Sequence, residues 1–274
     1  MDKINDKITA NAFANSWNNL PLGSVYTKDQ FEDWMRPLEK KDIIGKDVLE
    51  LGCGNASLMA HLCEWQPKFL EGVDLGDSVE TAKKNMAKTA CNSWRVTKAD
   101  LTKFESNDFD VVYCIGVLHH LKSPKAGLDA VIKNVKSGGR FHVWVYAKEG
   151  NFIVRYIVDP IRRISSHLPW WLTKYFIATP LVFPFFIYAK TLKMLSKIKL
   201  LKMLPLYEYS LWIAKRDFSF FRHVAFDQLV TPQTAYISRP TIEGWLQEYN
   251  EIEKDSIYII MRNGNSWKFG GKIK

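Results

Sequence analysis

The chain has 274 residues, of which 47% are hydrophobic and 24% charged, a size that suits one α/β core domain with an elaboration. Residues 1–18 lack an apolar run after a basic start, which argues against a signal peptide. The four cysteines show neither close pairing nor metal-ligand spacing, so we expect reduced thiols in a cytoplasmic protein.

The first predicted element is a strand that ends in a glycine turn, Val48 to Gly54, followed by a helical pattern from Ser57. Glycines let the backbone bend sharply and let a ligand approach its N–H groups. Ala56 replaces the third glycine of the dinucleotide fingerprint. Glu50 stands at the strand end, where a carboxylate would repel a pyrophosphate. The turn therefore favours a cationic cofactor over NAD.

Further strands follow and alternate with helical stretches. The second strand ends at Asp74, about 20 residues after the turn, which is the spacing at which a carboxylate binds both ribose hydroxyls. In an open parallel sheet ligands lie outside the carboxyl ends of the strands, so the groups that follow each strand face one crevice. The remaining predicted strands of this part, with the polar residues after them, are 94–99 with Asp100, 109–115 with His119 and His120, and 140–146.

With these motifs in order, residues 48–146 resemble the core of a class I S-adenosylmethionine-dependent methyltransferase, in particular the branch that acts on small molecules and lipids and includes quinone biosynthesis. The resemblance implies an α/β fold, namely a Rossmann-like, seven-stranded, doubly wound sheet with an antiparallel terminal strand and a helical insertion. It implies S-adenosylmethionine as cofactor and S-adenosylhomocysteine as product. The cofactor-binding residues that it implies are Glu50, Gly52, Cys53, Gly54, Asp74, Leu75, Asp100, Leu101 and Ile115.

The chemistry needs little from the protein beyond alignment, because the methyl donor is already an electrophilic sulfonium. Glu50 would balance the positive methionyl end of the cofactor. His119 and His120 are the predicted catalytic bases, because imidazole titrates near neutral pH, although a histidine here can also serve only to bond its loop. Relatives in quinone biosynthesis carry two metal-binding glutamates where Gly116 and His119 stand, so no metal is expected.

The insertion carries the excess of positive charge. Residues 151–226 hold twelve Lys or Arg against three Asp or Glu, which accounts for the net charge of +9. The uncharged run Tyr175–Ala189 is shorter than the roughly 18 to 20 residues of a membrane span, and Pro180 and Pro184 interrupt it. Lysines at helical spacing after this run predict an interfacial helix instead, and packing on the core as a lid is the alternative.

The end of the chain contains a predicted helix after Ser238 and two strands joined through Asn263–Asn265, a hairpin signal. Near the beginning, residues 13–17 and 24–27 resemble the entry segment of methyltransferases. We therefore expect three segments, listed in chain order: the N-terminal helices and cofactor-binding core in 1–150, the basic apolar insertion over the active-site mouth in 151–236, and the completion of the core sheet in 237–274.

The methyl acceptor is less well defined. A basic insertion suits RNA, since Lys and Arg neutralise phosphates, but the residues between these cations are mostly apolar. This favours a lipid-like, quinone-like or glycan-linked small acceptor, with peripheral contact of 151–226 to an anionic membrane. An RNA methyltransferase and a non-catalytic cofactor-binding scaffold are the alternatives. By their position beside the insertion, the predicted acceptor-pocket residues are Tyr146, Arg155, His223, Asp227 and Tyr236.

Overall fold

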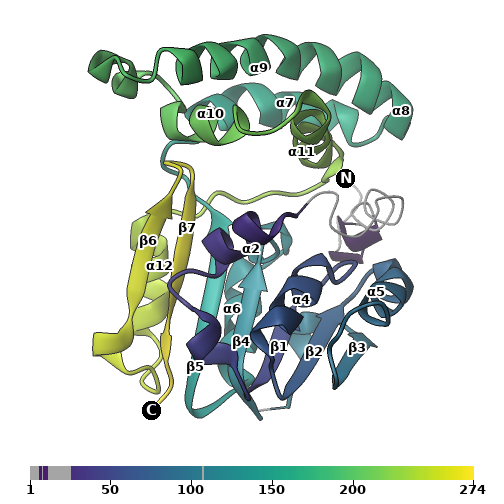
Figure 1. Ribbon diagram of the computed structural model, residues 1–274, viewed down its shortest axis with the longest axis vertical. Helices are drawn as coiled ribbons and strands as arrows, with labels where there is room; N and C mark the ends of the chain where they lie inside the picture. Colours follow the sequence, from purple (N-terminus) through teal and green to yellow (C-terminus); the bar gives the residue numbers. More distant parts are fainter. Residues whose placement is uncertain (1–5, 8, 12–25, 107) are drawn as a thin grey trace. The chain divides into compact units, whose positions relative to one another are not determined.

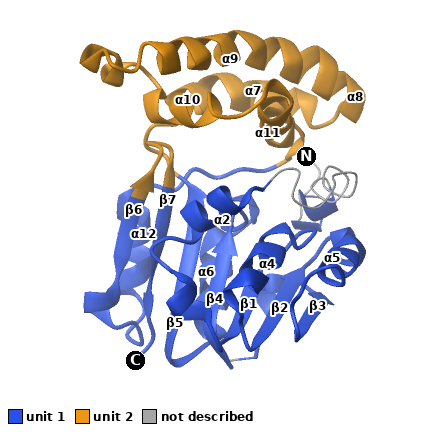
Figure 2. Ribbon diagram, viewed as in Figure 1, with its two compact units in different colours: residues 1–146, 233–260, 267–274 blue, residues 147–232, 261–266 orange. Residues whose placement is uncertain are grey.

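The computed structural model describes residues 6–7, 9–11, 26–106 and 108–274 (Figure 1). The predicted entry segment at 13–17 and residues 24–25 lie outside this part. Contacts divide the chain into two units: residues 1–146, 233–260 and 267–274 form the first, and residues 147–232 with 261–266 form the second (Figure 2).

A seven-stranded sheet of order β3-β2-β1-β4-β5-β7-β6 organises the first unit. β1 to β5 are parallel, whereas β6 and β7 are joined by a tight turn in which Asn263 and Gly264 both have positive φ, and such a hairpin is antiparallel. The predicted fold class is thus confirmed. The strands are β1 (Asp47–Leu51), β2 (Phe69–Asp74), β3 (Trp94–Lys98), β4 (Phe109–Ile115), β5 (Val135–Tyr146), β6 (Tyr258–Arg262) and β7 (Ser266–Lys272).

Helices cover both faces of this sheet. α2, α4 and α5 share a buried apolar cluster on one face with residues of β1, β2 and β4, and α6 and α12 lie on the other face (Figure 1). Side-chain caps begin several of them, such as Thr27 before α2 and Ser238 before α12. The helical elements are α2 (Lys28–Met35), α3 (Lys40–Ile43), α4 (Ser57–Leu62), η1 (Cys63–Trp65), α5 (Ser78–Met86), η2 (Leu101–Lys103), η3 (Leu118–His120), α6 (Pro124–Lys133), α12 (Arg239–Gln247) and η7 (Lys254–Ser256).

The second unit is helical. Its apolar core forms where Val182 and Ala189 of α9 meet Ile213 of α10 and Phe221 of α11. The elements are η4 (Val154–Val158), α7 (Asp159–Ser165), α8 (Trp170–Leu172), η5 (Thr173–Ala178), α9 (Thr179–Met194), η6 (Lys199–Met203), α10 (Tyr207–Ile213) and α11 (Phe218–Val230).

The expectation that two prolines interrupt the helix of the insertion is wrong. α8, η5 and α9 run on as one helix, Trp170–Met194, and within the described residues this helix alone is long and apolar enough to cross a membrane. Pro180 follows the π-helical stretch η5, where the regular i→i−4 hydrogen-bond pattern is already interrupted, so its missing N–H is tolerated. Pro184 lies inside the helix and deprives only the carbonyl of Pro180 of its donor.

The expectation of four reduced thiols is wrong for two of them. Cys63 at the end of α4 and Cys91 after α5 form a disulfide, with their Cα atoms 5.2 Å apart. The packing of α4 beside α5 brings together two residues 28 positions apart, which sequence spacing could not reveal. Cys53 and Cys114 are free and buried.

His142 of β5 is fully buried, and both of its ring nitrogens make hydrogen bonds inside the first unit. Its Nε2 lies 2.7 Å from the carbonyl oxygen of Trp34 and must donate to it, so Nδ1 accepts from the Tyr258 hydroxyl at 2.7 Å. The bond from Tyr258 needs the neutral ring, because a protonated Nδ1 could not accept it, whereas the bond to Trp34 forms in either state. Burial accordingly lowers the pKa of His142 to about 4.

We expect His142 to make the stability of the first unit depend on pH. Because its pKa is lower in the folded than in the unfolded chain, the unfolded chain binds the proton first as the pH falls. The free energy of unfolding should therefore drop by roughly 3 kcal/mol between pH ~6.5 and ~4. Urea titrations across this range measure the effect, and His142→Gln should flatten the part of the slope above pH ~5. Equal slopes in both proteins would contradict the assignment.

Candidate active site

The glycine turn after β1 is held against β2 by backbone hydrogen bonds. The N–H groups of Gly52 and Cys53 both donate to the carbonyl oxygen of Val73, at 2.7 and 3.1 Å. Gly52 has a φ of +84°, and a Cβ at this position would lie 2.4 Å from the side chain of Val117. Only glycine fits, because the loop after β4 rests directly on the turn.

Asp74 joins the ends of three strands. One carboxylate oxygen accepts from the Gly54 N–H at 2.9 Å, and the other accepts from the Gly76 N–H at 2.7 Å. The backbone carbonyl of Asp74 accepts from the N–H of Ala99, the residue before Asp100, at 2.9 Å. The turn after β1 and the loops after β2 and β3 therefore meet at one edge of the sheet. Burial raises the pKa of Asp74 above its ordinary value.

Glu50 is the most deeply buried acid of this edge, with 1% of its surface exposed. It pairs with Tyr113 across β1 and β4, and the Tyr113 hydroxyl donates to Oε2 at 2.8 Å. Burial raises the pKa of Glu50 to about 8, and the nearby carboxylate of Asp74 adds to the rise, while the Tyr113 hydrogen bond opposes it. A cation placed beside Glu50 would stabilise its charged form, so the site is electrostatically suited to a positive ligand.

The other predicted cofactor residues lie on the same loops. Asp100 is half-buried and accepts from the N–H and the hydroxyl of Thr102 at 3.0 and 2.6 Å, which fixes the start of η2. Leu101 and Ile115 are buried, whereas Leu75 is half-buried. Cys53 is buried, and burial raises the pKa of its thiol well above the ordinary value. The Cys53 side chain therefore serves to pack the turn and not to transfer protons.

The two predicted bases differ in their surroundings. His120 has its Nδ1 3.0 Å from the carbonyl oxygen of Gln233, so Nδ1 carries the proton and Nε2 is left as the basic nitrogen. His119 is fully buried, and its ring lies between those of His120 and Tyr146, with centroids 4.2 and 4.1 Å away. The geometry therefore favours His120 as a base and His119 as part of an aromatic wall.

Two of the predicted acceptor residues join this wall. The ring of Tyr146 stacks with that of Tyr236 at 6.3 Å between centroids, and Trp144 lies 5.4 Å from Tyr146. Arg155, His223 and Asp227 belong to the second unit, where His223 pairs with Asp227 at 3.3 Å. The structure thus brings Tyr146 and Tyr236 to the histidines, and a role for the other three in acceptor binding stays a prediction.

Sequence reasoning missed three partners. Tyr113 lies directly opposite Glu50 in the pairing of β1 with β4, a register that the two adjacent apolar strands of the sequence could have suggested. Trp144 lies two residues before Tyr146 in β5, so strand alternation predicts that both side chains are on the same face of the sheet. Gln233 carries no local signal, since its carbonyl reaches His120 across 113 residues of sequence.

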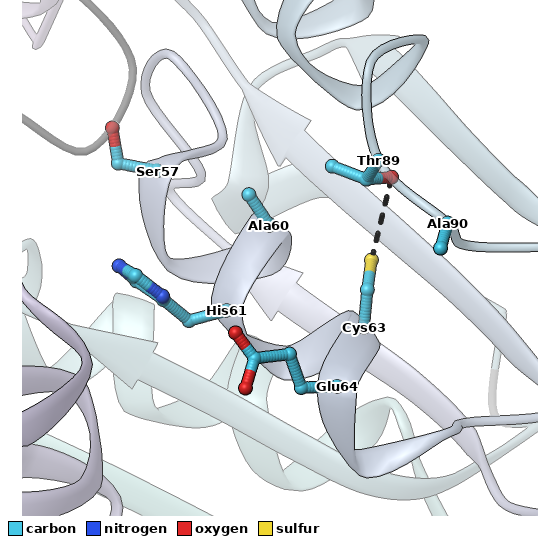
Figure 3. A pocket seen from close by; sticks show the side chains of 7 residues that line it. All are labelled: Ser57, Ala60, His61, Cys63, Glu64, Thr89 and Ala90. Carbon is cyan, nitrogen blue, oxygen red and sulfur yellow. Dashed lines mark hydrogen bonds between the residues drawn. The ribbon is translucent and has the colours of Figure 1, made fainter.

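A separate surface pocket of about 330 Å³ lies beside α4, lined by Ser57, Ala60, His61, Cys63, Glu64, Thr89 and Ala90 (Figure 3). It contains none of the strand-end acids. Its polar groups are engaged elsewhere: His61 bonds the carbonyl of Tyr26 at 2.8 Å, and Glu64 pairs with Lys28 at 2.5 Å. No group of three or more His, Cys, Asp or Glu that could hold a metal ion gathers in the described part of the chain.

Comparison with known proteins identifies this architecture. Residues 49–141 match the family model described as a methyltransferase domain. The chain therefore contains a class I S-adenosylmethionine-dependent methyltransferase domain, as the motifs predict. A chain in the solved complex of the Haloferax volcanii Trm112 methyltransferase activator with a methyltransferase is similar to this protein. The match covers 99% of this chain and 99% of that one, with 11% identity and a TM-score of 0.53, which shows a shared fold.

Among curated proteins, a ubiquinone biosynthesis O-methyltransferase of Neisseria meningitidis is 35% identical over 36% of this chain and 43% of its own length. A tRNA U34 carboxymethyltransferase of Helicobacter acinonychis is 33% identical over 34% of this chain and 38% of its own length. The chain spans less than half the length of these curated relatives. The similarity covers about a third of this chain, and the names of the two relatives point to different acceptors.

We expect binding of S-adenosylmethionine to release a proton from Glu50. The cationic ligand should lower the raised pKa of this carboxyl, so affinity should increase as the pH rises toward about 8, by up to about tenfold per pH unit, and then level off. Calorimetry in buffers of different ionisation enthalpy measures the release. Tyr113→Phe, which removes a bond that lowers the pKa, should move the plateau to higher pH. An unchanged pH dependence in Glu50→Gln would contradict the role of Glu50.

Proposed function

We propose that this protein transfers the methyl group of S-adenosylmethionine to a small apolar acceptor with a nucleophilic hydroxyl. One observation carries the cofactor part: Glu50 and Asp74 lie at the ends of β1 and β2, Asp100 follows β3, and backbone hydrogen bonds tie these strand ends to the glycine turn. In this proposal Glu50 faces the positive methionyl end of the cofactor, Asp74 binds the ribose hydroxyls, and Asp100 binds the adenine amino group.

The acceptor part rests on the aromatic wall. Rings of His119, Trp144, Tyr146 and Tyr236 contact one another beside the loop after β4. Aromatic faces suit a planar apolar molecule, such as a phenol or quinol, better than a sugar or a phosphate. The similarity to an enzyme of ubiquinone O-methylation supports the same class of acceptor.

His120 is the proposed general base. Its Nδ1 is held by the carbonyl of Gln233, with the Thr234 hydroxyl 3.2 Å away, and this leaves Nε2 to accept the proton of the acceptor hydroxyl. The acceptor oxygen then attacks the sulfonium-bound carbon and the carbon–sulfur bond breaks. S-Adenosylhomocysteine leaves as a neutral thioether.

RNA methylation is the second candidate, because a tRNA-modifying enzyme is also among the relatives. An assay with labelled S-adenosylmethionine separates the two, with a panel of phenols and quinols in one arm and total tRNA in the other. Labelled phenolic product supports the proposal, and label in tRNA alone overturns its acceptor part. A protein that binds the cofactor yet labels neither would be better described as a scaffold.

The first measurement concerns the cofactor. S-Adenosylmethionine and S-adenosylhomocysteine should bind with low-micromolar affinity, on the order of −8 kcal/mol, and NAD should not bind. Asp74→Ala should weaken binding strongly, since each hydrogen bond to a charged group contributes roughly 1.5 to 3 kcal/mol. Ser78→Ala is a matched control, because its hydroxyl makes only a 3.4 Å contact with Asp74. NAD binding, or full affinity in Asp74→Ala, would refute the site.

The second measurement concerns the base. His120→Ala should lower turnover by about two to four orders of magnitude with cofactor affinity retained, and the wild-type rate should fall below pH ~6. Tyr146→Phe, which keeps the aromatic wall, should have a much smaller effect. If His120→Ala instead loses cofactor binding, or keeps the wild-type pH profile at full rate, His120 is structural.

A further inference from the structure

The second unit exposes an unusual amount of apolar surface. In the described part of the chain, every exposed large hydrophobic side chain except Ile44 and Ile260 belongs to this unit. Scattered exposed apolar residues are normal on soluble proteins, whereas a contiguous set marks a surface that contacts a partner or a membrane.

The long helix shows such a set on one face. Phe176, Phe183, Ile187 and Met194 are exposed at spacings of seven, four and seven residues, which places them on one stripe about 27 Å long. The opposite face packs Val182 and Ala189 into the core of the unit. The helix is therefore apolar on both faces, and among the described residues the face with Val182 and Ala189 is the one that packs into the core of the unit.

The stripe leads into a segment of alternating cations and apolar residues. Residues 193–205, which we call the lysine–leucine tip, include Lys193, Lys197, Lys199 and Lys202, all exposed. Between them Met194, Leu200 and Met203 are 84%, 73% and 83% exposed. The sequence contains no Asp or Glu between Asp159 and Glu208, so nothing acidic offsets these lysines locally.

We propose that the lysine–leucine tip and the adjoining stripe dock on an anionic lipid bilayer. Lysines meet the headgroups, while Met194, Leu200 and Met203 enter the boundary with the acyl chains. The inference does not depend on methyl transfer, because no residue of the proposed active site takes part in it.

The helix lies on the bilayer rather than across it. Its inner face contacts α10 and α11, and Lys190 Nζ donates to the carbonyls of Ala214 and Arg216 at 2.9 and 3.1 Å. A spanning orientation would strip the helix from these partners and would move Lys190 away from two acceptors. Helical spacing alone groups Lys190 with Lys193 and Lys197. Its hydrogen bonds show instead that Lys190 joins α9 to the segment after α10 inside the unit.

RNA is the less favoured partner. Single-stranded RNA is bound by a basic groove with aromatic platforms, and the tip presents methionine, leucine and isoleucine between its lysines. Charge alone would serve either partner, but only a bilayer takes up the exposed aliphatic side chains as well.

Vesicle co-sedimentation of the full chain tests the proposal. Wild-type protein should pellet at low salt with phosphatidylcholine vesicles that contain 30 mol% phosphatidylglycerol, and salt should weaken the binding. Replacing Lys193, Lys197, Lys199 and Lys202 by glutamine should weaken it by at least about a hundredfold, at roughly fivefold per lysine. Leu200→Ser with Met203→Ser should weaken it at unchanged charge. Both variants should keep the helical circular dichroism of the wild type, which verifies that the second unit is folded, and its S-adenosylmethionine affinity, which verifies the first unit.

A matched control makes the same change of charge on the first unit. Lys40, Lys84, Lys88 and Lys122 are exposed there, and their replacement by glutamine should leave vesicle binding intact. Equal loss in this control, or wild-type protein that stays in the supernatant, overturns the proposal. So does binding that resists alkaline carbonate, which would indicate a spanning helix. Tip-dependent binding of tRNA without vesicle binding, or tip-dependent dimerisation in gel filtration, overturns it as well.

Discussion

The hydrogen bonds of the glycine turn after β1 are the constraint on which the candidate site depends. Gly52 and Cys53 bond Val73, and Gly54 bonds Asp74, so the turn fixes the end of β2 as well as its own strand. At Gly52 the side chain of Val117 occupies the space that a Cβ would need. The loop after β4, which carries Val117 and the two histidines, is therefore packed directly on the turn. One backbone conformation thus sets the relative positions of the acids and of the proposed base.

Burial of carboxylates at this edge costs free energy unless a cation compensates it. Glu50 has only the Tyr113 hydroxyl as a side-chain donor among the hydrogen bonds described, and Asp74 brings a second negative charge close by. In the empty protein this repulsion and the burial hold Glu50 in its protonated form to a pH of about 8. A sulfonium and an ammonium would relieve that repulsion, whereas a pyrophosphate would increase it. Selectivity for the cofactor class therefore arises from electrostatics as much as from shape.

Local patterns predicted much of this molecule, because strand alternation, glycine turns and caps act over a few residues. The parallel strands, the hairpin at Asn263–Asn265 and the acids after the strands follow from such patterns. Local patterns did not predict the features that depend on contacts between residues far apart in the sequence. The Cys63–Cys91 disulfide and the bond from Gln233 to His120 join segments that only the fold brings together. The helix through Pro180 and Pro184 was misread because local propensity yields to tertiary packing.

Lys190 and the lysines of the tip illustrate why a charge pattern alone is ambiguous. On a helical wheel Lys190, Lys193 and Lys197 share a face, yet it is Lys190 that donates to the carbonyls of Ala214 and Arg216, at and just after the end of α10. The ammonium group of Lys190 binds carbonyls within the second unit, whereas the lysines of the tip are exposed on the surface. The hydrogen bonds that place Glu50 and Asp74 lie wholly within the first unit. Cofactor chemistry and surface attachment are therefore carried by different residues, and each can change without disturbing the other.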